Sequence, residues 1–244
     1  MSLNRKNIIR EQAEKLADSR DKWIKKNSYF YNDDYSYMKF LVNSDMRVLE
    51  LGCGTGELLK ELNPSYGVGV DLSSGMISIA QKKYPDLNFI QGDLEDEKLI
   101  SSLEGQFDFI IFSDTIGYLD DCEGAFSRLH KLCSPGTRLI VSYYSWLWQP
   151  ILTLGEKVGM KMPSVDMNWL STEDTVGFLQ LADFETVKRE WRQLVPRSMF
   201  GIGSIINRFV GTLPLIRRLS LRNYLVARPV RKVGLNKPSA TVLI

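Results

Sequence analysis

The chain has 244 residues, of which 44% are hydrophobic and 25% charged, with a formal net charge of +2. This composition is that of an ordinary globular domain, and an odd count of three cysteines without paired spacing argues against a disulfide framework and against a zinc site. No apolar run has the length of a membrane span or a signal peptide. The cysteine count favours a reducing, cytoplasmic setting. We therefore expect a cytoplasmic protein with a single domain, 1–244, and no metal site.

Short apolar runs alternate with helical patterns along residues 46–144. The pattern predicts strands at 47–51, 66–72, 87–93, 107–114 and 137–144, and helices from Gly56 to Pro64, at 73–85 and at 122–133. Ser73 or Ser74 caps the helix at 73–85. Such alternation predicts right-handed crossovers and a parallel sheet covered on both faces, with ligands at the carboxyl ends of its strands.

The pattern loosens after the fifth strand. A helix is predicted at 171–182, where Ser171 and Asp174 have the spacing of a capping box, and two further strands at 184–194 and 222–230. Residues 145–170 and 195–220 are connections. In the second connection the apolar residues fit one helical face: Ile202, Ile205, Ile206, Phe209, Val210 and Leu213.

The stretch RVLELGCGTGELL carries a glycine-rich turn between the first strand and a helix. It lacks the lysine that a phosphate-binding P-loop requires, and its glycines Gly52, Gly54 and Gly56 are spaced one residue more tightly than in the dinucleotide fingerprint GxGxxG. Glu50 precedes the turn and would repel a pyrophosphate. The turn therefore favours a ligand that carries an ammonium group.

Two acids at strand ends indicate which other groups this ligand carries. Asp71 ends the second strand and could accept hydrogen bonds from both ribose hydroxyls, and Asp93 ends the third strand, where it could accept one from an adenine amino group. Adenine, ribose and a zwitterionic tail without phosphate together describe S-adenosylmethionine.

These motifs carry a resemblance to a known family. VLELGCGTG, GVDLSSGMISIA, FIQGDLED and FDFIIFSDTIGYLDD, in this order, resemble the motifs of class I S-adenosylmethionine-dependent methyltransferases. The resemblance implies a Rossmann-like α/β fold with a seven-stranded, mostly parallel sheet, an antiparallel seventh strand and helices on both faces. It also implies the residues that contact the cofactor: Glu50, Gly52, Cys53, Gly54, Gly56, Asp71, Leu72, Met76, Asp93, Leu94 and Ser113. Met76 is equally well explained as core.

The candidates that would face the transferred methyl group are Asp114, Tyr118, Tyr143 and Tyr144. We favour Tyr118 as the catalytic group, with Asp114 as the second candidate, because many relatives place a substrate-facing group at the matching position of the loop. The alternative is that these tyrosines only line a pocket. His130 lies late in a crossover helix, away from the strand carboxyl ends, so we expect a structural or surface histidine.

Three segments are expected to cover the cofactor core, 46–144. They are the N-terminal cap, 1–45, which is helical and aromatic, and the insertions 145–170 and 195–220. The acceptor pocket is expected to contain Tyr29, Tyr31, Tyr143, Tyr144 and Trp146. Together the segments place aromatic, apolar and basic groups over the methyl group, which favours a small-molecule acceptor with an apolar and an anionic part.

Charge is distributed unevenly between the two parts of the chain. Residues 187–244 carry 12 Lys and Arg and one acid, Glu190, whereas residues 1–186 carry 19 Lys and Arg and 28 Asp and Glu. The C-terminal part is therefore either a peripheral membrane contact or other anion-binding surface, or a solvated basic face.

The expected activity is O-methylation of a sugar, lipid-linked glycan or secondary metabolite, because the whole pattern is also similar to bacterial methyltransferases encoded near glycosyltransferases. Two alternatives stay open: a nucleic-acid methyltransferase and an inactive cofactor-binding domain. SDTIGY stands where base methyltransferases carry Asn/Asp-Pro-Pro-Tyr/Phe, which disfavours nucleic acid, and the intact glycine turn disfavours loss of catalysis.

Overall fold

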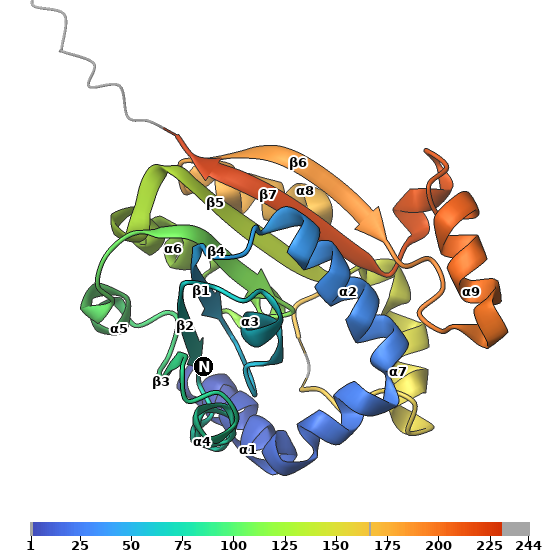
Figure 1. Ribbon diagram of the computed structural model, residues 1–244, viewed down its shortest axis with the longest axis horizontal. Coiled ribbons are helices and arrows are strands. Elements are labelled where there is room, and N and C mark those ends of the chain that lie inside the picture. Colours follow the sequence, from blue (N-terminus) through green and yellow to red (C-terminus); the bar gives the residue numbers. More distant parts are fainter. Residues whose placement is uncertain (1, 166, 231–244) are drawn as a thin grey trace, which may run out of the picture.

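The computed structural model describes residues 2–165 and 167–230, which form a seven-stranded sheet with helices on both faces (Figure 1). The strand order is β3-β2-β1-β4-β5-β7-β6, and β7 runs antiparallel to both of its neighbours. The strands are β1 (Arg47–Leu51), β2 (Tyr66–Asp71), β3 (Asn88–Gln91), β4 (Phe107–Ser113), β5 (Cys133–Tyr144), β6 (Phe184–Arg192) and β7 (Arg222–Pro229). The predicted fold class is confirmed.

Side chains of the central strands alternate between two hydrophobic clusters. In β4, Ile110 and Phe112 belong to one cluster and Ile111 to the other, and in β5, Ile140 packs on the side opposite to Leu139. Because a strand sends successive side chains to opposite faces, continuous apolar runs need helices on both sides of the sheet.

The α-helices of the described residues are α1 (Ser2–Lys26), α2 (Ser28–Leu41), α3 (Glu57–Glu61), α4 (Ser74–Lys83), α5 (Glu97–Ser102), α6 (Cys122–Ser127), α7 (Gln149–Lys157), α8 (Thr172–Leu181) and α9 (Ile202–Ile205). The Ser73 side chain accepts the Met76 N–H and caps α4, and Ser171 and Asp174 form the predicted capping box of α8. No helix among residues 2–165 and 167–230 is long and apolar enough to cross a membrane.

Two predicted elements differ from the structure. The helix predicted at 122–133 is an α-helix only to Ser127, and residues Arg128–Leu132 form a tighter 3₁₀ turn. Strand β5 then begins at Cys133 instead of residue 137, because Thr137 Oγ1 donates to the Phe107 carbonyl and binds the SPG stretch to β4. The register shift between Phe107 and Phe109 accommodates this stretch.

The segment 195–220, in which the apolar residues were predicted to share one helical face, is not a single continuous α-helix. The segment consists of short turns around α9, followed by a π-helical stretch, Ile206–Val210, and a 3₁₀ turn, Ile216–Leu219. Phe200 interrupts it with a φ of 56°. Most of its apolar side chains, including Ile205 and Phe209, are exposed to solvent.

Candidate functional site

A cavity of about 380 Å³ lies at the carboxyl ends of the parallel strands. Its walls come from the ends of β1, β2 and β4, from α1 and α2, and from the segment after β5. It brings together most of the predicted site residues: Glu50, Gly52, Cys53, Gly54, Asp71, Leu72, Met76, Asp93, Leu94, Ser113, Asp114 and Tyr118, with Tyr31 and Tyr144. Parallel strands end at the same edge of a sheet, which explains why residues far apart in sequence meet here.

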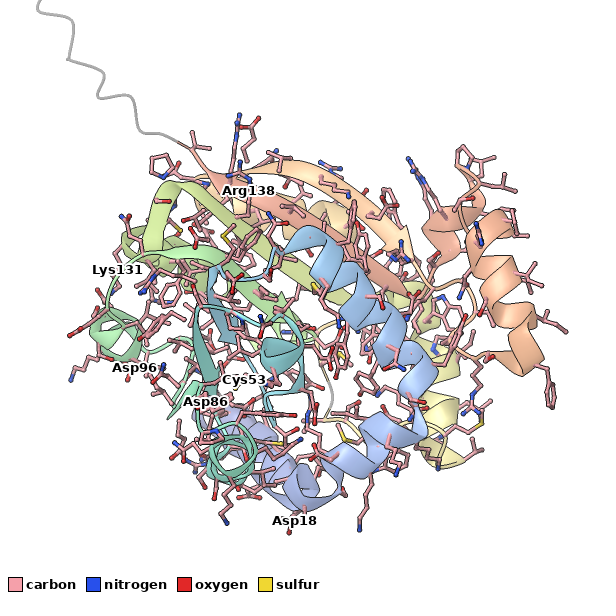
Figure 2. The ribbon with its side chains drawn as sticks, viewed as in Figure 1. Asp18, Cys53, Asp86, Asp96, Lys131 and Arg138 are labelled. Atoms are coloured by element: carbon pink, nitrogen blue, oxygen red, sulfur yellow. The ribbon has the colours of Figure 1, made fainter. Side chains whose placement is uncertain are left out.

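The glycine turn between β1 and α3 has a backbone that few other residues could adopt. Gly52 has a φ of 85°, and a Cβ built there would lie 2.1 Å from Thr115 Oγ1. A Cβ on Gly54 would lie 2.6 Å from Arg20 Nε. Cys53, labelled in Figure 2, lies buried at this turn. The two glycines therefore let the turn pack closely against Thr115 and Arg20. Gly56, which precedes α3, does not line the cavity.

Asp71 joins the glycine turn to the start of α4. Its Oδ2 accepts the Gly54 N–H at 2.8 Å and its Oδ1 accepts the Ser73 N–H at 2.9 Å. Burial raises the pKa of the Asp71 carboxyl, although both hydrogen bonds act in the opposite direction. The side chain is thus fixed by backbone donors, and its remaining lone pairs face the cavity that it lines.

Glu50 and Arg20 flank the glycine turn, and each has a polar atom without a hydrogen-bond partner among the described residues. Glu50 is buried within β1 and its Oε2 accepts no hydrogen bond, while Arg20, half-buried on α1, has an unpaired Nε. Burial raises the pKa of Glu50 to about 8, against the opposing effect of Arg20. A buried acceptor and a buried donor without partners are costly unless a ligand pairs with them.

Asp93 is held by the first turns of α1. Lys6 Nζ donates to Asp93 Oδ2 at 2.6 Å and lies 3.0 Å from Glu95 Oε2. The Glu95 N–H donates to Asp93 Oδ1 at 2.9 Å. Burial opposes the charge of Lys6, but these acids outweigh it and raise its pKa. Leu94, buried beside them, completes this wall of the cavity.

Asp114 occupies a strained position immediately after β4, with a φ of 56°. Its Oδ2 accepts a hydrogen bond from Arg222 Nη1 at 3.0 Å, while its buried Oδ1 has no partner among the described residues. Arg222 is fully buried at the start of β7 and also donates to Ser142 Oγ at 2.9 Å. The arrangement holds one carboxylate oxygen and leaves the other without a partner, in a residue that lines the cavity.

The guanidinium of Arg222 is the fixed cation of this region. It lies 3.6 Å from Asp34 Oδ1, and Asp34 accepts the Tyr224 hydroxyl at 2.6 Å. Burial opposes the charge, but Asp114 and Asp34 raise the pKa of Arg222 well above its usual value. A buried cation between two acids keeps its charge and orients both carboxylates.

Tyr118 ends a 3₁₀ turn, Ile116–Tyr118, and lines the cavity near Asp114. Burial, with the nearby Asp114 charge, raises the pKa of its phenol to about 12. Arg5 of α1 holds the turn by donating to the carbonyls of Gly117 and Tyr118, each at 3.0 Å. A phenol with this pKa stays protonated near neutral pH and can donate a hydrogen bond.

The structure does not bring Tyr29, Tyr143 and Trp146 into the cavity. Tyr143 and Tyr144 are neighbours in β5 and point to opposite faces, so only Tyr144 reaches it. Tyr143 donates instead to the Ser171 carbonyl at 3.4 Å, Tyr29 accepts hydrogen bonds from Ser204 and Asn207, and Trp146 is exposed.

His130 lies outside the cavity, as the sequence predicts. Its Nε2 is 2.7 Å from the Ala182 carbonyl, and its ring stacks on Phe184 with the centroids 4.5 Å apart. The role of this histidine is therefore packing against the N-terminal end of β6.

The remaining wall is mostly apolar and comes from the two insertions. Residues after β5 contribute Trp148, Ile151, Leu152, Met160, Met162 and Pro163, and Pro196 and Arg197 come from the segment after β6. Lys161 forms an ion pair with Glu156, so the wall presents few unpaired charges. An apolar wall with a few convergent polar groups is typical of a small-molecule site.

Four site residues were missed by the sequence analysis: Arg5, Lys6, Arg20 and Arg222. The positions Ile9, Ala13, Leu16, Arg20 and Ile24 lie on one face of α1 and line the cavity, so an arginine within an apolar helical stripe is the signal that could have found Arg20. Arg222 could have been noticed as a charged residue at the start of a predicted strand that is otherwise largely apolar.

Comparison with known proteins agrees with the family resemblance of the sequence motifs. A family model described as a methyltransferase domain matches residues 23–207. A malonyl-[acyl-carrier protein] O-methyltransferase of Priestia megaterium is 35% identical over 42% of this chain and 38% of its own length. A second protein of that description, from Ilyobacter polytropus, is 28% identical over 64% of this chain and 63% of its own length. This chain therefore spans less than two thirds of either protein.

Solved structures share the fold. An S-adenosylmethionine-dependent methyltransferase of Thermotoga maritima aligns with a TM-score of 0.67 at 21% identity, covering 90% of this chain and 99% of that one. The magnesium protoporphyrin IX methyltransferase of Synechocystis, with bound S-adenosylhomocysteine, aligns with a TM-score of 0.60 at 17% identity, covering 92% and 99%.

Proposed function

Since the chain belongs to the methyltransferase domain family and uses S-adenosylmethionine, we propose that it methylates an oxygen atom of a small molecule that has an apolar part. The observation that carries the oxygen assignment is the unpaired, buried Oδ1 of Asp114 on the acceptor side of the cavity. A hydroxyl acceptor must lose a proton when it is methylated, and this oxygen is a base without another partner.

The donor side of the cavity fits the cofactor. Glu50 would hold its ammonium and Arg20 its carboxylate, since each offers a buried polar atom of the right charge. Asp71 would hold the ribose hydroxyls, and Asp93 with Leu94 the adenine edge. Gly52 and Gly54 line this side of the cavity with bare backbone, which the cofactor could approach closely.

The bound cofactor supplies an activated methyl group and a good leaving group, so the protein contributes approach, alignment and exclusion of water. Asp114 would accept, at Oδ1, the proton that the acceptor hydroxyl loses. Arg222 keeps this carboxylate oriented through its hydrogen bond to Oδ2. Tyr118, neutral below a pKa of about 12, donates a hydrogen bond to the acceptor.

Sugars, lipid-linked glycans and hydroxylated secondary metabolites are the acceptor classes that we favour. Their hydroxyl groups match Asp114 and Tyr118, and the apolar wall around Trp148 and Met162 suits a hydrophobic portion. The Priestia megaterium relative is described as an O-methyltransferase, which agrees with an oxygen acceptor.

The test is transfer of a radiolabelled methyl group to a panel of hydroxylated acceptors by the wild type, Asp114→Asn and the surface control Asp86→Asn. We expect Asp114→Asn to lower kcat by about two to four orders of magnitude, while calorimetry shows unchanged cofactor affinity. Asp86 is exposed, and its variant should match the wild type. Transfer to amines alone, or an Asp114→Asn variant as fast as the wild type, would contradict the assignment.

A further inference from the structure

The segment between β6 and β7 presents many apolar side chains to solvent. The exposed ones are Met199, Phe200, Ile202, Ile205, Phe209, Val210, Leu213, Leu215 and Leu219. Leu215 is 85% exposed and Phe209 63%. Scattered surface leucines are normal, but so many within one short segment mark an interaction site.

Helix α7 carries a second set of exposed apolar side chains. Ile151, Leu154 and Val158 are exposed and lie on one face of the helix, since they are three and four residues apart. Trp146 and Leu147, just before the helix, are exposed as well. The helix also lines the cavity, through Ile151, Leu152 and Gly155.

Hydrogen bonds place these two segments next to each other. Trp148 Nε1 donates to the Leu219 carbonyl at 2.8 Å. At the elbow between α1 and α2, Lys26 Nζ donates to the carbonyl of Gly159 at 2.6 Å and Tyr29 accepts from Ser204 at 3.2 Å. We call the exposed apolar residues of 146–158 and 199–219 the outer face; its α9 part projects from the side of the molecule (Figure 1).

Basic groups surround the outer face, and acidic groups are nearly absent from it. Lys157, Arg197, Arg208 and Arg218 are exposed on the two segments. In the described parts of 146–170 and 191–230 the sole acid is Glu156, which is paired with Lys161. A partner of this face must therefore be both apolar and anionic.

We propose that the outer face docks on the surface of a bilayer that contains anionic lipid. Phe, Leu and Ile side chains on short helices, with Arg and Lys beside them, match a segment that lies at the boundary of headgroups and acyl chains. Anionic headgroups attract each nearby basic residue. A second copy of the chain fits less well, because a symmetric contact would bring the same arginines face to face.

The outer face lies next to the rim of the cavity. Ile151 of α7 and Arg197, at the start of the other segment, both line the cavity and are exposed at its rim. A molecule docked in this way presents its acceptor side to the lipid. Docking itself needs no methyl transfer, so it can be tested independently of the proposed function.

The test is flotation of the full chain with vesicles of phosphatidylcholine, with and without phosphatidylglycerol. We compare the wild type with Ile205→Glu/Phe209→Glu, with Arg208→Gln and with the control Leu181→Glu. Leu181 is as exposed as Phe209 but ends α8, next to the N-terminal end of β6 and away from the cavity. Thermal melting and cofactor calorimetry show that each variant is folded.

We expect the wild type and Leu181→Glu to float only with phosphatidylglycerol. The double variant should lose about tenfold or more in partitioning, and Arg208→Gln about fivefold. The proposal is overturned if the wild type does not float, if the double variant floats as well as the wild type, or if size-exclusion chromatography shows a wild-type dimer that the double variant abolishes.

Discussion

Glu50 allows a sharp test of the donor site through the protons exchanged on binding. Burial raises the pKa of this carboxyl to about 8 in the free protein, so most of it is protonated at pH 7. A bound ammonium group favours the carboxylate and lowers the pKa again. Binding of the cofactor should therefore release a proton, and the variant Glu50→Gln should remove that release.

The magnitude follows from the pKa. With a pKa of about 8, Glu50 binds about 0.9 of a proton at pH 7 and about 0.1 at pH 9. The number of protons released on cofactor binding should therefore fall from about 0.9 to about 0.1 between these two pH values. By linkage, cofactor affinity should rise by on the order of tenfold per pH unit below pH 8 and level off above it.

Titration calorimetry in buffers of different ionisation enthalpy measures the released proton directly. The comparison uses wild type and Glu50→Gln, each with S-adenosylmethionine and with 5′-methylthioadenosine, which lacks the amino-acid end. The difference between the two proteins isolates Glu50 from other titrating groups. Equal proton release by both proteins, or release with 5′-methylthioadenosine as large as with the cofactor, would refute the reasoning.

Two further variants separate the parts of the donor site. Asp71→Ala should weaken S-adenosylmethionine binding on the order of a hundredfold, because hydrogen bonds to a carboxylate contribute more than neutral ones, and unchanged affinity in calorimetry would exclude the ribose role. Arg20→Met should weaken S-adenosylmethionine about tenfold or more and leave 5′-methylthioadenosine unaffected; equal losses for both ligands would assign Arg20 to packing of α1 instead.

The elements that the sequence predicts best are those specified locally. The glycine turn, the cap at Ser73 and the capping box at Ser171 depend on residues within a few positions of each other, and the structure has the two caps where they were predicted. The strand ends then follow from the parallel topology, which is why Asp71 and Asp114 meet in one cavity.

The features that the sequence did not predict depend on contacts between residues far apart in the chain. Arg222 pairs with Asp114 across 108 residues, and nothing near either residue in the sequence indicates this pairing. For 202–213, periodicity predicts that the apolar residues share one helical face. It does not show what covers that side, and the structure leaves Ile205 and Phe209 in solvent. The basic residues at 231–244 lie outside the described residues.

The ion pair between Asp114 and Arg222 has a consequence for how the acceptor specificity of this protein can evolve. The donor wall is built by residues 50–94 with α1, whereas Asp114 is oriented from the last strand and the apolar wall comes from 148–163. Substitutions in 148–163 can therefore reshape the acceptor side while the contacts of Glu50 and Asp71 stay intact. Such a division lets one scaffold acquire new acceptors in small steps, with the methyl source unchanged throughout.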